Sequence, residues 1–159
     1  TRIKNSEAHK IVNNLDVNTR YELSNGTKFK TNDYGYVEEI SFKPIDEKMP
    51  RTSQQTAIGY LGEIGDVGGH IQACRYGGTC DRYNLFPQNG NFNNSAYKVY
   101  FENIVKKAVD QGKALDVVIK FERSTPNSPR PDKLRVTIGV EGGKYRYVNE
   151  FKNQYGGGK

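Results

Sequence analysis

A single segment of the chain, Asn93–Gly112, carries a long helical repeat, and it stands between segments with strand-like patterns. Its apolar residues recur every three or four positions and form one stripe, namely Tyr97, Phe101, Ile104, Val105 and Ala108. Such a stripe lies on one face of a helix and is buried against another element. Asn94 and Ser95 are both suitable N-caps, and Gly112 is a suitable stop. The sequence therefore predicts one principal helix packed on β-structure.

The segments before this helix alternate between apolar and polar residues, as half-buried strands do. Tyr21–Ser24 and Thr27–Lys30 flank Asn25-Gly26, which is a strong hairpin signal. A further strand is expected at Tyr36–Phe42, followed by a charged, proline-containing loop at Lys43–Ser53.

The segments after the helix alternate as well. They predict strands at Leu115–Phe121, at Leu134–Val140 and around Tyr145–Tyr147, with a tight hairpin at Gly142-Gly143. The proline-rich segment Arg123–Pro131 is expected to be a long loop. The pattern is that of one α+β domain: a sheet, a central strand–loop–helix unit, and more sheet.

A chain of 159 residues is the size of one domain. We expect residues 1–19 to be a linker segment with some helix at Glu7–Leu15, residues 20–155 to form the domain, and the glycine tail at 156–159 to be flexible. Thr1 in place of Met suggests a piece excised from a longer protein, such as the end of a larger secreted one. No apolar run approaches the ~20 residues of a membrane span, and the start lacks the apolar core of a signal peptide.

The net charge of +6 and the pI near 9.2 suit a polyanionic partner, although charge alone does not select one. One window of the chain combines glycines, a histidine and asparagines in a pattern that suggests a catalytic site. It reads Gly65-Asp66-Val67-Gly68-Gly69-His70, Arg75-Tyr76-Gly77-Gly78, Asn84-Leu85-Phe86-Pro87-Gln88 and Asn93-Asn94-Ser95-Ala96-Tyr97. A histidine near its ordinary pKa can take a proton from water, and a neutral amide oxygen can hold a hard cation. These are the two requirements of a one-metal phosphodiesterase.

The order and spacing of these stretches resemble the DNA/RNA non-specific endonucleases, which have the ββα-metal (His-Me finger) fold. The upstream Arg51–Gln55 stretch is similar too, and the resemblance covers roughly Tyr21 to Val140. It is closest to the branch found as C-terminal toxin domains of bacterial polymorphic toxins, of the contact-dependent inhibition, Rhs and LXG types. The implied fold class is α+β, a ββα-metal core with a flanking antiparallel sheet.

The resemblance also implies roles for particular residues. His70 is the expected general base, and Asn93 is the expected protein ligand of Mg²⁺ or Mn²⁺. Arg51 is expected to stabilise charge that develops on the phosphate, with Arg75 as the competing candidate. Glu102 is the expected holder of a metal-bound water.

The spacing of Glu102 is in conflict with this assignment. In the family the glutamate follows the metal ligand by eight residues, whereas Glu102 follows Asn93 by nine and Asn94 by eight. At about 100° per residue, nine residues reach the opposite side of a helix. Three alternatives follow: Asn94 is the ligand, the helix starts with an irregular turn, or Glu102 does not hold water and pairs with Lys98 or Lys106.

Other residues of the window are expected to support the site. Asn84 and Gln88 resemble positions that brace it by hydrogen bonding, Asp66 is a candidate to orient the imidazole or shape the turn, and Gly69 allows a close approach of backbone or phosphate.

The sequence thus predicts a metal-dependent endonuclease that cleaves DNA, and also RNA if the site reads phosphates alone. By resemblance it is an antibacterial toxin domain that is delivered from the producing bacterium, acts in the cytoplasm of the target cell and is neutralised by an immunity protein.

Two alternatives stay open. One is a nucleic-acid-binding module without catalysis. The other is a zinc-stapled interaction domain that uses Cys74, Cys80 and His70, although a zinc site wants about four ligands and the remaining candidate, His9, is distant in sequence. The two cysteines bracket a short loop, so a local disulfide is equally compatible with the sequence.

Overall fold

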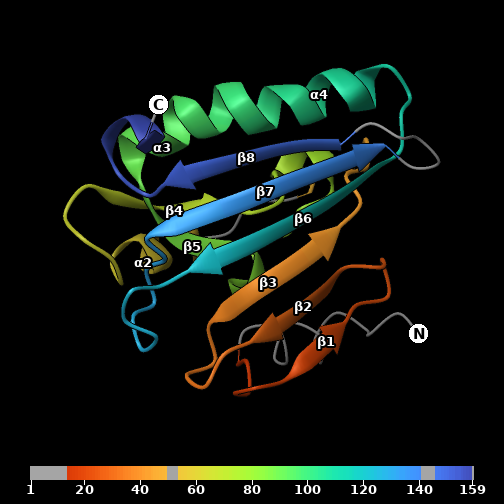
Figure 1. Ribbon diagram of the computed structural model, residues 1–159. Helices are drawn as coiled ribbons and strands as arrows, with labels where there is room; N and C mark the ends of the chain where they lie inside the picture. The colour runs from red at the N-terminus through yellow and green to blue at the C-terminus, as the bar shows by residue number, and fades with distance from the viewer. Residues whose placement is uncertain (1–13, 50–53, 141–145, 159) are drawn as a thin grey trace.

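The computed structural model describes residues 14–49, 54–140 and 146–158, and these fold into two antiparallel sheets with the helices on one side (Figure 1). The strands are β1 (Arg20–Glu22), β2 (Lys28–Thr31), β3 (Val37–Phe42), β4 (Asp66–His70), β5 (Leu85–Asn89), β6 (Leu115–Glu122), β7 (Lys133–Val140) and β8 (Arg146–Lys152). The helices are α2 (Gln54–Gly59), α3 (Gly90–Asn94) and α4 (Asn103–Asp110), with a π-helical turn at Lys98–Glu102 and short 3-10 turns at Cys74–Tyr76, Arg82–Asn84 and Tyr155–Gly158. None of the helices in this part of the chain is long and apolar enough to cross a membrane.

The larger sheet has six strands in the order β1-β2-β3-β6-β7-β8. Strand β3 pairs with β6, in a register that sets Ile40 opposite Ile119, although the two strands are far apart in sequence. Along β6, Leu115, Val117, Ile119 and Phe121 are buried, and the residues between them are exposed or half-buried. This alternation confirms the predicted strand at Leu115–Phe121 and means that, among the described residues, β6 is buried on one face and more exposed on the other.

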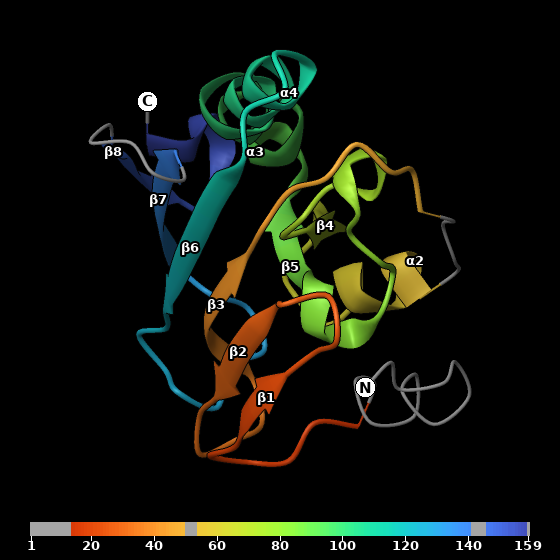
Figure 2. The same ribbon diagram turned by 90° about the vertical axis from the view of Figure 1, so that its right-hand side faces the viewer.

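The smaller sheet is the hairpin β4–β5, and it runs directly into α3. The pairing sets Asp66 opposite Asn89 at one end and His70 opposite Leu85 at the other. Figure 2 shows β4, β5 and α2 beside one face of the large sheet. Phe86 on β5 packs against Phe121 on β6, with ring centroids 5.4 Å apart, so the ββα unit and the sheet share one core.

The principal helix begins earlier than predicted. The Asn89 side chain caps it by accepting a hydrogen bond from the Phe92 N–H, so the expected N-caps, Asn94 and Ser95, are wrong. The reason is that β5 passes into the helix without a loop, which puts the cap on the last residue of the strand. At the other end Gly112 has a φ of 73° and stops the helix as predicted.

The helix is also irregular. Ser95 has φ −123° and ψ −89°, outside the helical region, and α3 ends at the residue before it. Further on, the Asn103 N–H donates to the Lys98 carbonyl five residues back, which is the bond of a π-turn.

The glycine tail is ordered, contrary to the prediction. The Gly156 N–H donates to Asn91 Oδ1 at 2.7 Å, and Gly157 is buried against Ala96 and Phe92. Glycine fits here because both Gly156 and Gly157 have positive φ and a Cβ at Gly157 would lie 2.7 Å from the Phe92 ring. The expected helix at Glu7–Leu15 and the turn at Gly142-Gly143 lie largely or wholly outside the described residues.

Candidate active site

His70 is the last residue of β4, and the residue before it, Gly69, has no room for a side chain. A Cβ at Gly69 would lie 1.9 Å from Gln88 Oε1, and one at Gly59 would lie 3.0 Å from the β4 backbone. These glycines let β5 and α2 close on β4. As a result, His70 is only 9% exposed.

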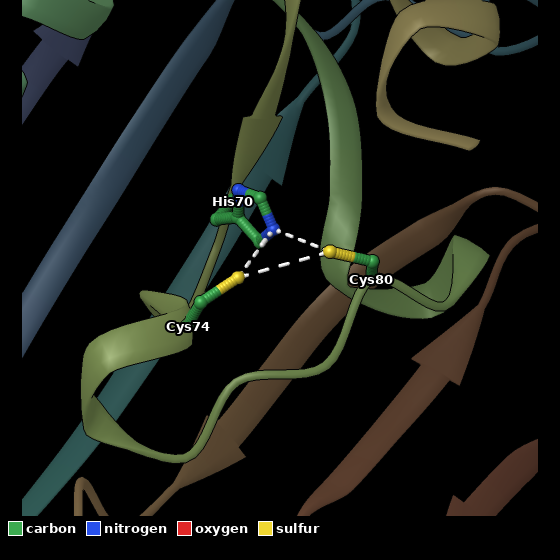
Figure 3. A group of neighbouring side chains, drawn as sticks. All are labelled: His70, Cys74 and Cys80. Carbon is green, nitrogen blue, oxygen red and sulfur yellow. Dashed lines mark hydrogen bonds between the residues drawn. The ribbon is translucent and has the colours of Figure 1, made fainter. Parts of the chain in front are cut away.

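The imidazole of His70 meets both cysteines (Figure 3). Its Nε2 atom lies 3.1 Å from Cys74 Sγ and 3.2 Å from Cys80 Sγ, and the two sulfur atoms are 3.7 Å apart. Both cysteines are free thiols and both are buried. The other ring nitrogen, Nδ1, lies on the side of the ring away from the sulfurs. The structure thus brings together the three residues that the zinc-stapled alternative named.

The loop that carries the cysteines is held by a buried asparagine. Asn84 is 0% exposed; its Oδ1 accepts from the Gln72 N–H, and its Nδ2 donates to the carbonyls of Gln72 and Thr79. Gln72 in turn donates from Nε2 to the Tyr76 carbonyl. The predicted bracing contacts of Asn84 are therefore present, and they fix the loop between Gln72 and Thr79.

The contacts of Nε2 set the chemistry of the ring. A neutral imidazole carries one proton, so one nitrogen donates and the other accepts. If Nε2 bears the proton and donates it to a sulfur, the Nδ1 lone pair is the basic site. The sulfur atoms then act as the orienting partner of a general base.

The asparagines around the start of the helix differ in their contacts. Asn89 caps α3, and Asn91 Oδ1 accepts hydrogen bonds from Gly156 and from Ser95 Oγ. The side chains of Asn93 and Asn94 form no hydrogen bond within the described residues; Asn93 is half-buried and Asn94 is exposed. Of this pair, Asn93 is the better placed to present an amide oxygen from a fixed position. The choice of Asn93 stays a prediction.

Because the helix is irregular, the spacing of nine residues between Asn93 and Glu102 no longer means that they lie on opposite sides of the helix. The break at Ser95 and the π-turn both fall between Asn93 and Glu102, and a π-turn takes one residue more than an α-turn. An irregular turn, the second of the three alternatives, is thus present near the start of the helix at Ser95, and the roles of Asn93, Asn94 and Glu102 stay predictions. Glu102 lies beside Gln72 and Ala73, next to the cysteine loop.

One of the two lysines that the surface alternative offered to Glu102 has another carboxylate as its partner. Lys106 forms its ion pair with Asp110, at 2.6 Å. Glu102 instead lies close to the fully buried Tyr97. Burial and this carboxylate together raise the pKa of Tyr97 well above its ordinary value.

Asp66 does not orient the imidazole. It lies at the opposite end of β4 from His70, and its side chain is 1% exposed. Its Oδ2 accepts from Arg130 Nε at 2.6 Å and from the Glu63 N–H at 2.9 Å. Asp66 therefore shapes the turn before β4 and ties it to the β6–β7 loop, and the orienting role is wrong because the carboxylate is fully engaged elsewhere.

Gln88 does not brace the site by hydrogen bonding. It is 0% exposed, and neither atom of its amide has a hydrogen-bond partner within the described residues. Its Oε1 lies against the backbone of Gly69, so Gln88 fills the space that the glycine leaves.

Of the two candidate arginines, only Arg75 lies within the described residues. Arg75 is exposed and forms an ion pair with Asp46, which raises the pKa of Arg75. Arg51 lies outside the described residues, so its role as the charge-stabilising group stays a prediction.

The contacts of the two cysteines with His70 are the feature of this site that the sequence left open. The spacing of His70, Cys74 and Cys80, with three and five residues between them, was a usable signal. It pointed to zinc only weakly because the fourth candidate ligand, His9, is distant in sequence.

The family model for DNA/RNA non-specific endonucleases matches residues 17–142. The chain belongs to this family, and the membership supports a nuclease.

Two solved structures share the fold. One is NucA from Streptococcus agalactiae with magnesium ion bound, with a TM-score of 0.63 at 16% identity over 92% of this chain and 80% of that one. The other is NucA from the same organism with no metal bound, with a TM-score of 0.63 at 15% identity over 91% of this chain and 87% of that one. No curated protein matches the chain. The predicted class, α+β with a ββα-metal core and a flanking antiparallel sheet, is confirmed.

Proposed function

We propose that this protein is a metal-dependent endonuclease that hydrolyses phosphodiester bonds of DNA, and of RNA, with little sequence preference. One observation carries the proposal. In a chain of this family, the ββα unit sets His70 at the end of β4 and Asn93 on the helix that leaves β5 directly.

The residues present fit a hard divalent cation at Asn93. Its half-buried amide is left unused by the described residues, whereas the two preceding asparagines are committed to the cap and to the tail. A single neutral ligand suits Mg²⁺ or Mn²⁺, which keep several waters. When bound there, the cation would stabilise negative charge on the phosphate.

His70 has the role of general base. With Nε2–H directed at the sulfurs, the Nδ1 lone pair takes a proton from the attacking water. The positive charge that then develops on the ring faces Cys74 and Cys80 through Nε2–H. Asn84 holds the loop and so fixes the direction of the ring through both cysteines.

The test is cleavage of supercoiled plasmid and of total RNA with Mg²⁺, with Mn²⁺ and with excess chelator. Wild type should degrade nucleic acid only with metal. His70→Ala should lower the rate by about 10²–10⁴-fold, the usual contribution of a general base. Asn93→Ala should also abolish metal-dependent cleavage, and Asn94→Ala, which removes the neighbouring exposed amide, is the matched control.

Two results would count against the proposal. Cleavage that survives His70→Ala would exclude the mechanism. Tight binding of nucleic acid by folded wild type, without cleavage in either metal, would identify a non-catalytic binding module.

The biological setting is part of the proposal. We infer an antibacterial toxin domain that is delivered from the producing cell, acts in the target cytoplasm and is neutralised by an immunity protein. The support is the resemblance of the site window to toxin domains and a net charge of +6, which suits an acidic inhibitor. Expression of wild type in a bacterial cytoplasm should degrade DNA and arrest growth, whereas His70→Ala should not. Co-expression of the protein encoded beside the toxin should restore growth, and failure to do so would remove that protein as the inhibitor.

A further inference from the structure

The geometry points to a zinc site formed by His70, Cys74 and Cys80, in which zinc takes the Nε2 lone pair of His70 and so prevents the ring from acting as a base. The zinc site rests on the contacts of these three residues. Its inhibitory effect rests on the proposed function.

The three donor atoms are spaced as zinc ligands are. Bonds of about 2.3 Å to sulfur and about 2.0–2.1 Å to nitrogen place tetrahedral donors roughly 3.5–3.8 Å apart. The two sulfur atoms are 3.7 Å apart, and Nε2 lies 3.1 and 3.2 Å from them. A shift of the imidazole by about half an ångström would complete three corners of a tetrahedron.

The donors also select the kind of metal. Thiolates and imidazole favour zinc and other soft or borderline ions, whereas Mg²⁺ requires oxygen ligands. This site is therefore chemically distinct from the one proposed at Asn93. A set of two cysteines and one histidine leaves the fourth position for water or another small ligand, as in open zinc sites.

The loop is already shaped to hold the donors together. The Met49 N–H donates to the Cys74 carbonyl at 2.7 Å, and the Gly78 N–H donates to the Ala73 carbonyl at 3.0 Å. A Cβ at Gly78 would lie 1.7 Å from the Gln72 carbonyl oxygen, so only glycine lets the loop close. With Cys74 and Cys80 both 3% exposed, the ligands lose little conformational freedom when an ion binds.

Occupation by zinc and contact with a thiol have opposite effects on His70. With Nε2–H donating to sulfur, Nδ1 has a lone pair for catalysis. With Nε2 coordinated to zinc, the neutral ring carries its proton on Nδ1 and has no lone pair left. Binding also releases the two thiol protons, so each zinc ion displaces two protons from the protein.

The first arm of the test measures binding without reference to activity. Reduced, metal-free wild type is titrated with Co²⁺ and then with Zn²⁺. We expect one ion per chain, with a thiolate-to-cobalt charge-transfer band that Zn²⁺ abolishes. The band should be lost in Cys74→Ser with Cys80→Ser and kept in Ala73→Ser, which adds the same hydroxyl beside Cys74. If the double variant does not fold, competition between wild type and a chelator of known affinity still measures binding.

The second arm follows the ring itself. Nitrogen NMR of the imidazole, in a His9→Gln background that leaves one histidine signal, should show the neutral ring in its Nε2–H form without zinc. With one equivalent of zinc, it should show the Nδ1–H form at the same pH. This arm decides the state of His70 even if no preparation cleaves nucleic acid, a result that would reject only the proposed function.

The third arm measures cleavage in Mg²⁺ with and without one equivalent of Zn²⁺. Zinc should lower the wild-type rate by about 10²-fold or more, as loss of a general base does. The ratio of the two rates should approach one in the double cysteine variant, whatever its own rate, and should stay low in Ala73→Ser. Absence of the cobalt band in reduced wild type would overturn the site. A normal band with unchanged or increased cleavage would overturn the masking of His70.

Discussion

The six-stranded sheet and the loop around His70 are held together in different ways. In β6, apolar side chains such as Val117 and Ile119 alternate with exposed residues and are completely buried. Between His70 and Asn84 there is no such alternation, and order comes from buried side-chain amides that bond to backbone groups. A packed apolar core tolerates substitutions of similar volume, whereas a loop held by buried hydrogen bonds loses stability when one bonding partner is removed.

The salt link between the start of β4 and the β6–β7 loop, outside both regions, should show the largest effect. Asp66→Asn removes the negative charge closest to Arg130, whose side chain is 11% exposed, and leaves this largely buried cation with only more distant, solvent-exposed carboxylates. We expect a loss of about 3–5 kcal/mol in the free energy of unfolding, measured by urea denaturation. Glu63→Gln is the control, because Glu63 is 75% exposed and 3.8 Å from Arg130, and it should cost at most about 1 kcal/mol. Equal losses in the two variants would contradict the assignment.

A cavity in the sheet should destabilise the protein without altering the site. Ile119 is 0% exposed, so Ile119→Ala should lower the free energy of unfolding by about 2–5 kcal/mol. Cobalt binding and cleavage per folded molecule should stay at the wild-type level. Val118→Ala, on the other face of β6, should cost less. A loss of cobalt binding in folded Ile119→Ala would show that the two regions are coupled.

Two buried asparagines offer a direct comparison of the regions. Asn84→Ala leaves three backbone groups in the loop unpaired, and Asn153→Ala does the same to Asn89, Pro87 and Pro131. Each should cost about 1–3 kcal/mol in urea denaturation. Asn84→Ala alone should also weaken the cobalt band, since it alone frees the cysteine loop. The same spectrum in both variants would mean that Asn84 does not position the cysteines.

The smallest effect is expected at Tyr97, whose hydroxyl donates to the carbonyl of Ile71 at 3.0 Å, one residue beyond His70. Tyr97→Phe should cost about 1 kcal/mol at neutral pH, whereas Tyr155→Phe, at a residue 78% exposed, should cost almost nothing.

The effect of Tyr97 should depend on pH. Burial and Glu102 raise the pKa of Tyr97 above its ordinary value of 10.0, so the fold favours the neutral phenol. The contribution of this raised pKa to the free energy of unfolding is complete below pH 10. It falls at higher pH, because the tyrosine of the unfolded chain releases its proton first. The stability gap between wild type and Tyr97→Phe should narrow above pH 10, and a gap that widens there would contradict the direction of the shift.

The sequence by itself determined the α+β class, the strands β1–β3 and β6–β8 and the stop at Gly112. Alternation and helical spacing are local signals of which face a residue buries, and they need no knowledge of distant partners. The window from Gly65 to Glu102 also showed the resemblance to the endonuclease family, because its glycines, histidine and asparagines occur in the order typical of that family.

Only the tertiary structure decided how that window works. The cap at Asn89, the π-turn before Asn103 and the packed glycine tail depend on how β5 and the C-terminal turn meet the helix. The partners of Asp66 and of His70 come from other segments, and spacing along the chain does not encode distances between segments. The sequence therefore allowed either a disulfide between the cysteines or a zinc site that lacked a nearby fourth ligand. The fold brings both sulfur atoms into contact with Nε2 of His70.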